Sequence, residues 1–144
     1  MKISTKGRYA LRLMLDLAMH QEGDPVRIKD IAARQDISAK YLEQIVSVLV
    51  KAKYVRSVRG PQGGYHLAKK PEEYTAGSII ALIEGDLSPV SCLEDEVNRC
   101  PRQSVCVTLR LWKELDQAIH EVLDRYTLAD MMEWQMELAG DFVI

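Results

Sequence analysis

Three cysteines, Cys92, Cys100 and Cys106, are the residues of this sequence with the clearest capacity for chemistry. They lie within 15 residues of one another, and an odd number of thiols cannot close into intrachain disulfides alone. Gaps of seven and five residues leave no CxxC pair of the zinc-ribbon kind. Loosely spaced thiolates suit an iron–sulfur cluster, zinc or cuprous copper. Reactive redox thiols and plain buried cysteines stay open as alternatives.

A second set of side chains could bind DNA. Gln44 can pair with adenine and Glu43 can accept a hydrogen bond from the cytosine amino group. Arg59, beside Gly60 in a glycine-rich turn, could enter a narrow minor groove. Hydroxyl and ammonium groups nearby are better suited to phosphate. The candidate DNA-binding residues are Ser38, Lys40, Tyr41, Glu43, Gln44, Arg59 and Gly60.

The elements that must position these residues follow from periodicity and turn signals. Helical spacing predicts helices over about 8–21 and 28–35, and Ser38 is a good N-cap for a third helix to about Ala52. Strands over 54–59 and 65–68 flank the turn Gly60–Gly64. This order predicts a mainly α fold with a small β-hairpin wing, a winged helix-turn-helix, rather than a helical domain with an incidental hairpin.

The second half of the chain predicts more helices around the cysteines. Thr75 caps a helix over about 76–84, residues 86–103 are irregular, and a long helix covers about 104–125. Thr127 caps a last helix to about Leu138. An apolar seam with heptad spacing on the long helix favours dimerisation: Trp112, Leu115, Ile119 and Val122. We expect a DNA-binding domain over 1–70 and, over 71–144, a cluster-binding loop (about 86–106) with dimerisation helices.

Charge divides the chain in the same place. Residues 1–70 hold 14 Lys and Arg against 6 Asp and Glu, whereas residues 71–144 hold 5 against 15. A basic first half favours a polyanion as its partner. The sequence has no apolar run of membrane-spanning length and no secretory signal pattern, so we expect a cytoplasmic protein. We find no nucleophile-and-base constellation, and the glycine turn joins two strands rather than cradling phosphate, so we expect no enzyme.

Several stretches resemble the iron–sulfur cluster regulator (IscR) family of bacterial winged-helix transcription factors. They are Met1–Ala10, Ile37-Ser38, Tyr41–Gln44, Val58–Tyr65, Thr75–Gly77, the cysteine loop, Leu111-Trp112 and Thr127-Leu128. The resemblance implies a homodimer that binds a double-stranded DNA operator. It implies that Ser38, Tyr41 and Gln44 contact the operator and Arg59 the minor groove, and that Glu43 helps to choose between operator classes. It implies a cluster on Cys92, Cys100 and Cys106, most often [2Fe-2S], received from the iron–sulfur assembly machinery. The implied role is repression of iron–sulfur assembly genes.

The sequence departs from that family at the ligands. The family pattern has five residues in both cysteine gaps, and a histidine where this chain has Leu109. Related nitric-oxide-sensing regulators use a carboxylate of the partner's first helix, where this chain has Arg8. We expect another non-cysteine ligand, with Asp16, Glu94, Asp95 and Glu96 as candidates. A thiol-redox or nitric-oxide-responsive regulator, and a regulator of cysteine metabolism, are the alternative functions.

Overall fold

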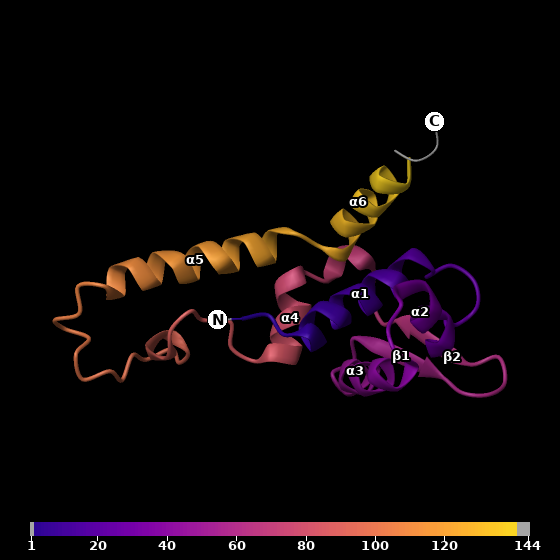
Figure 1. Cartoon of the computed structure of the whole chain (residues 1–144), viewed down its shortest axis with the longest axis horizontal. Helices are drawn as coiled ribbons and strands as arrows, with labels where there is room; N and C mark the ends of the chain where they lie inside the picture. Colours follow the sequence, from indigo (N-terminus) through magenta and orange to yellow (C-terminus); the bar gives the residue numbers. More distant parts are fainter. Residues whose placement is uncertain (1, 141–144) are drawn as a thin grey trace.

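The computed structural model describes residues 2–140, which form an elongated molecule (Figure 1). Within these residues, six α-helices, two 3₁₀ turns and one antiparallel hairpin follow one another. The order is α1 (Thr5–Met19), α2 (Ile28–Gln35), α3 (Ala39–Lys51), β1 (Val55–Val58), β2 (Gly64–Leu67), η1 (Pro71–Glu73), α4 (Ala76–Glu84), η2 (Ser91–Leu93), α5 (Leu109–Arg125) and α6 (Leu128–Gly140). The predicted fold class, mainly helical with a β-hairpin wing, is confirmed.

Helix α1 is the central element of the fold. Its residues Leu13, Met14 and Leu17 recur at helical spacing and are buried, as predicted. The helix begins three residues before the predicted start, because the Ser4 hydroxyl caps it by accepting a hydrogen bond from the Gly7 amide at 3.1 Å. Ser4 is therefore the sequence signal for this earlier start.

Helices α2 and α3 form the predicted helix-turn-helix. Helix α2 ends at Gln35, and the next residue, Asp36, has a left-handed φ of 54° that turns the chain sharply. Ser38 then caps α3, since its hydroxyl accepts a hydrogen bond from the Tyr41 amide at 3.1 Å. The predicted apolar stripe of α3, which consists of Leu42, Ile45, Val46 and Leu49, is buried. Its opposite side therefore stays exposed to solvent.

The wing is tied to the segment before α2. Strands β1 and β2 pair in the register Val55↔Leu67 to Val58↔Gly64. Strand β1 is one residue shorter at each end than predicted, and β2 begins and ends one residue earlier than predicted. Val26 and Tyr65 exchange backbone hydrogen bonds at 3.0 and 2.8 Å, which adds a third short pairing. A side chain at Gly64 would collide with the Val26 carbonyl, so the close approach requires glycine.

The second half of the chain partly joins the core of the first. Ile79 of α4 and Leu128 of α6 belong to the same buried cluster as the α1 and α3 side chains. The predicted cap of α6 is confirmed: the Thr127 amide donates to Asp130 at 2.8 Å and the Asp130 amide to the Thr127 hydroxyl at 3.2 Å. The division into domains at residue 70 stays a prediction.

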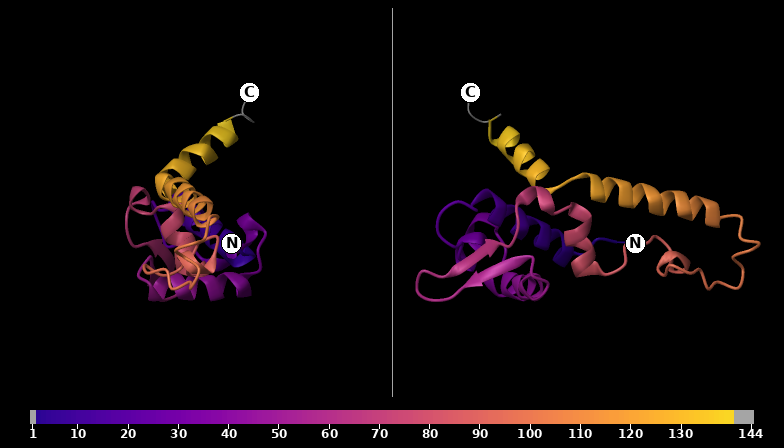
Figure 2. Two further views of the ribbon diagram at one scale, coloured as in Figure 1. Left: turned by 90° about the vertical axis from the view of Figure 1, so that its left-hand side faces the viewer. Right: turned by 180° about the vertical axis from the view of Figure 1, so that it is seen from behind.

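Helix α5 extends away from this core. Both Figure 1 and Figure 2 show it as an arm beside the segment that carries the cysteines, at the opposite end of the molecule from the wing. It begins at Leu109, not near residue 104 as predicted, because residues 101–105 form turns. Cys106 therefore precedes the helix instead of lying on it. Among residues 2–140, no helix combines the length and the apolar composition that crossing a membrane requires.

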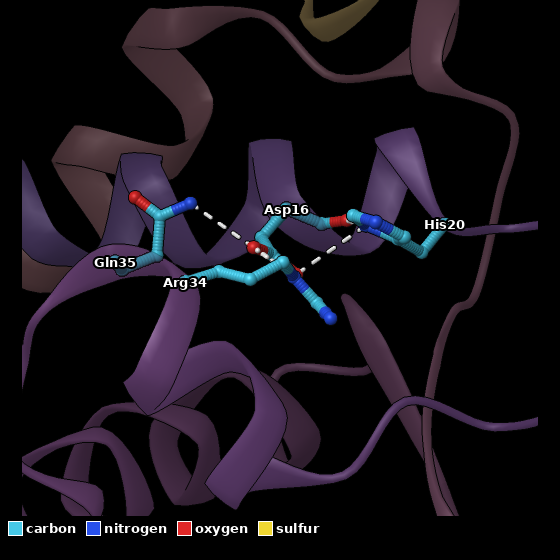
Figure 3. A network of polar contacts seen from close by, with 4 residues as sticks. All are labelled: Asp16, His20, Arg34 and Gln35. Atoms are coloured by element: carbon cyan, nitrogen blue, oxygen red, sulfur yellow. Dashed lines mark hydrogen bonds and ion pairs between the residues drawn. The ribbon is translucent and has the colours of Figure 1, made fainter.

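A buried carboxylate joins α1 to α2 (Figure 3). Asp16 lies on the side of α1 that faces the core and is only 3% exposed, although its side chain is a carboxylate. Arg34 donates to its two oxygens at 3.0 and 2.7 Å, and Gln35 donates at 3.0 Å. The hydrogen bond to Asp16 raises the pKa of Arg34 above its ordinary value. The His20 Nδ1 lies 3.5 Å from the same carboxylate but 2.8 Å from the Asp16 backbone carbonyl, so the donors to the buried charge are Arg34 and Gln35.

This network predicts a stability effect. We expect Asp16→Ala to lower the free energy of unfolding by about 2–3 kcal/mol, because Arg34 and Gln35 lose a charged acceptor. Asp24→Ala removes an exposed carboxylate nearby in sequence and is expected to change it by about 0.5 kcal/mol or less. Urea denaturation followed by circular dichroism, at one fixed protein concentration, measures both. Equal effects of the two substitutions would show that the network contributes nothing specific.

Candidate nucleic-acid interface and cysteine segment

The N-terminal part of α3 presents polar side chains to solvent. Ser38, Lys40, Glu43 and Gln44 are exposed, and Tyr41 is half-buried. The residues belong to one surface because the helix buries its opposite, apolar side. The structure thus gathers the five α3 residues that the sequence had indicated. Ser38, which directly precedes α3, is the N-cap of the helix.

Arg59 and Gly60 are exposed at the tip of the wing. Gly60 has a φ of +104°, a left-handed conformation that favours glycine, and its carbonyl accepts from the Gly63 amide at 2.9 Å. Arg27, at the start of α2, donates to the Pro61 carbonyl at 2.7 Å. The wing tip is therefore anchored to the helix-turn-helix. Sequence reasoning missed Arg27, since a bond across 34 residues leaves no local signal.

The cysteine segment lies far from this surface. Cys92 and Cys100 line one hollow of about 320 Å³, together with Asp95 and Arg99, whereas Cys106 is not part of its lining. All three are partly exposed free thiols. Nowhere in residues 2–140 do three Cys, His, Asp or Glu side chains come together as a metal site. The structure therefore brings two of the three predicted ligands to one place and leaves the third outside it.

The groups that line the hollow have the chemistry to bind an iron–sulfur cluster, but they do not include all three cysteines. Asn98 accepts a hydrogen bond from the Cys100 amide at 2.9 Å, while its buried Nδ2 has no partner among the described residues. An unpaired buried donor is costly unless an acceptor reaches it. Asn98 does not line the hollow, so the chemistry that suits a cluster comes from the two thiols and the Asp95 carboxylate that do. The donor types therefore fit an iron–sulfur cluster, but Cys106 would have to be brought to the hollow.

Cys106 has its own environment at the start of α5. Its sulfur lies 3.4 Å from the Thr108 hydroxyl, and this hydrogen bond lowers the pKa of the Cys106 thiol below its usual range. Backbone amides at the start of the helix and Arg102 act in the same direction. The site therefore favours the thiolate, the form that binds metals and reacts.

Of the four carboxylates expected as possible ligands, only one lines the hollow. The Asp16 oxygens are occupied by Arg34 and Gln35. Glu94 and Glu96 are exposed and do not line the hollow, whereas Asp95 does. The sequence could have removed Asp16 from the candidates, because a carboxylate within an apolar helix stripe is buried and is therefore usually paired with another side chain.

One side of α5 is apolar and uncovered. Leu111, Leu115 and Val122 are 55%, 41% and 47% exposed. A groove of about 360 Å³ along the helix is lined by Ile3, Leu87, Ala118, Ile119, Val122 and Leu123. Of the predicted seam, Trp112 and Ile119 are half-buried and Leu115 and Val122 are exposed. Exposed aliphatic side chains in a row are typical of a surface that another chain covers.

A helix-turn-helix with an anchored wing and exposed polar side chains on its second helix is typical of the class of DNA-binding transcriptional regulators. The chain belongs to the Rrf2 family, whose model, described as an iron-dependent transcriptional regulator, matches residues 3–134. The expected resemblance to the IscR regulators is confirmed. The expectation that the protein is no enzyme is confirmed by the same relatives, which are transcriptional regulators.

Relatives span most of this chain. "Protein rrf2" of Nitratidesulfovibrio vulgaris is 46% identical over 92% of this chain and 87% of its own. The IscR regulator of Aliivibrio salmonicida is 42% identical over 92% of this chain and 77% of its own. The solved structure of CymR, the global cysteine regulator of Bacillus subtilis, is similar with a TM-score of 0.77 at 44% identity, covering 93% of this chain and 98% of that one.

Proposed function

We propose that this protein binds a double-stranded DNA operator through α3 and the wing. The observation that carries the proposal is the surface of α3, where the candidate base-reading and phosphate-binding side chains are exposed together beside an anchored wing. In this arrangement Gln44 and Glu43 read base edges in the major groove, and Ser38, Lys40 and Tyr41 bind phosphates. Arg59 and Gly60 approach the minor groove. Such a protein acts in the cytoplasm, where thiols stay reduced.

Gln44 and Lys40 should differ in what they contribute. We expect Gln44→Ala to cost about 1–3 kcal/mol on the operator and to relax selectivity at one base pair, because it removes a base contact. Lys40→Ala should weaken binding to operator and random duplexes alike and reduce the salt slope by about one. Fluorescence anisotropy with a duplex that the wild-type chain selects from a random library measures both. Equal losses for Gln44→Ala on both duplexes would contradict base reading.

We further propose a homodimer formed through α5. Its support is the exposed apolar row of Leu111, Leu115 and Val122 beside an apolar groove. A twofold dimer would present two copies of α3 to two half-sites of one operator.

The dimer can be tested with a charge placed in that row. Leu115→Glu should shift the protein to monomers and weaken operator binding, because a carboxylate cannot be desolvated there without a partner. Gln117→Glu adds the same charge on an exposed position of α5 outside the row and should leave the dimer intact. Sedimentation equilibrium gives the mass of each variant. A dimeric Leu115→Glu variant would show that another surface joins the subunits.

We propose that the cysteine segment senses iron–sulfur status through a bound cluster, with [2Fe-2S] as the type that the resemblance implies. Cys92, Cys100 and Cys106 would hold it, and Asp95 would supply the non-cysteine ligand. Supporting observations are the hollow that Cys92, Cys100 and Asp95 share and the unpaired Asn98 donor within the segment. When bound, the cluster supplies redox sensitivity and lability. The regulated genes would be those of iron–sulfur assembly, whose machinery would donate the cluster.

Anaerobic purification tests the cluster and its ligand. Wild-type protein should absorb in the visible and contain equal amounts of iron and sulfide. Asp95→Asn should change the visible circular dichroism and speed the loss of iron, because a carboxylate ligand is replaced by a weaker one. Glu96→Gln removes the same charge one residue away and should leave spectrum and stability unchanged. Colourless wild-type protein that resists reconstitution would contradict the cluster; identical spectra for both variants would contradict Asp95 alone.

A thiol-redox regulator is the second candidate. The observation that favours it is that all three cysteines are free and partly exposed, with two of them at one hollow. The similarity to the cysteine regulator CymR points the same way and extends the alternative to cysteine metabolism. Its mark would be colourless protein whose DNA binding changes reversibly with oxidant and thiol reductant.

A further inference from the structure

Two side chains of α1 hold the turn of the helix-turn-helix from outside. Arg12 reaches the end of α2, where its Nε donates to the Gln35 side-chain oxygen at 3.1 Å and its Nη2 donates to the Gln35 carbonyl. Gln35 is the last residue of α2, so its carbonyl lacks a partner within that helix and a guanidinium there is favourable. Arg12 thus fixes the point at which the turn begins.

Tyr9, one helical turn earlier, fixes the point at which the turn ends. Its ring meets the ring of Tyr41 edge to face, with 5.7 Å between the centroids. The guanidinium of Arg12 lies over the same Tyr9 ring, 5.3 Å from its centroid. A continuous set of contacts therefore runs from the end of α2 through Arg12 and Tyr9 to the first turn of α3.

These contacts lie at the rim of the domain and not in its core. Leu42 and Ile45 of α3 are fully buried and hold the helix to the domain without help from Arg12. Two guanidinium nitrogens of Arg12, Nε and Nη2, already donate hydrogen bonds to Gln35. The guanidinium therefore points toward protein and not toward a DNA phosphate. The contacts of Tyr9 and Arg12 can therefore set the orientation of α3, whereas its buried apolar side chains hold it to the domain.

We propose that Tyr9 and Arg12 are positioning residues for operator selectivity. By fixing both ends of the turn, they set the angle at which the first turns of α3 present Gln44 and Glu43 to base edges. Side chains that read bases tolerate only small errors in placement, whereas phosphate contacts by flexible side chains tolerate more. This inference rests on the proposed DNA interface, and it assigns a role to two residues that do not themselves contact DNA.

The experiment compares the full-length protein with four variants on two duplexes. One duplex is selected by the wild type from a random library, and the other is a scrambled duplex of the same composition. The selectivity ratio is the dissociation constant for the scrambled duplex divided by that for the selected duplex. It is measured at several salt concentrations, and thermal unfolding is recorded for each variant. We expect Tyr9→Leu and Arg12→Met to reduce the ratio about three- to tenfold, the range of an aromatic-pair contact, with little change on the scrambled duplex.

Two controls separate positioning from other effects. Tyr9→Phe keeps the ring and should keep the wild-type ratio. Arg8→Met removes an equal charge from the same helix. Among residues 2–140, the Arg8 guanidinium donates only to the hydroxyl of Thr5, three residues earlier, at 2.8 Å, so any loss should be equal on both duplexes. Because Arg12 is exposed, its variant keeps the test decisive even if Tyr9→Leu folds poorly.

Three results would overturn the inference. Equal losses for Arg12→Met on both duplexes, with a salt slope lower by about one, would make Arg12 a phosphate ligand. A lower unfolding temperature with an unchanged ratio in both variants would leave only a structural role. A wild-type chain that selects no duplex from the library would remove the proposed DNA interface itself and this inference with it, an outcome distinguishable from the other two.

Discussion

The packing of α1 is the constraint on which the rest of the structure depends. Helices α2, α3, α4 and α6 and strand β2 all contact it. A helix covered on so many sides must be apolar around most of its circumference, and Leu13, Met14 and Leu17 meet that requirement. Asp16 is the exception, and its burial is possible only because Arg34 and Gln35 of α2 supply hydrogen-bond donors. The charge in the core therefore also fixes the first helix of the DNA-binding motif.

The same helix connects the two ends of the molecule. At its N-terminus the Glu84 carboxylate of α4 accepts from the Ser4 amide at 2.8 Å, and Gly7 leaves room for that approach. Helix α4 contacts α5, where Gly77 lies against Asp124 and Leu123 with no space for a side chain. Contacts thus run from α5 through α4 to α1 and the turn before α3. Contact alone does not establish coupling, which requires two arrangements that a ligand binds unequally.

Most of the fold could be predicted because its signals are local. The stripes of α1 and α3, the caps at Ser38 and Thr127, and the glycine turn each lie within a few residues and point to one structure. The start of α5 was predicted too early for a local reason as well, because residues 101–105 form turns instead of continuing the helix toward the N-terminus. Arg12, Arg27 and Asp16 could not be assigned partners, because each binds a residue at least 18 positions away and one sequence carries no record of such pairs.

The cysteine segment was the least predictable part, for a physical reason that also bears on its proposed role. No residue from 88 to 108 is buried, so hydrophobic burial does not determine its conformation. Short local hydrogen bonds do, such as those from the Ser88 amide to Asp86 at 2.6 Å and from the Cys100 amide to Asn98. A segment held this weakly can be rearranged at small cost by a group that binds its thiols. Because the segment continues directly into α5, any such rearrangement acts first on the helix whose apolar side is exposed.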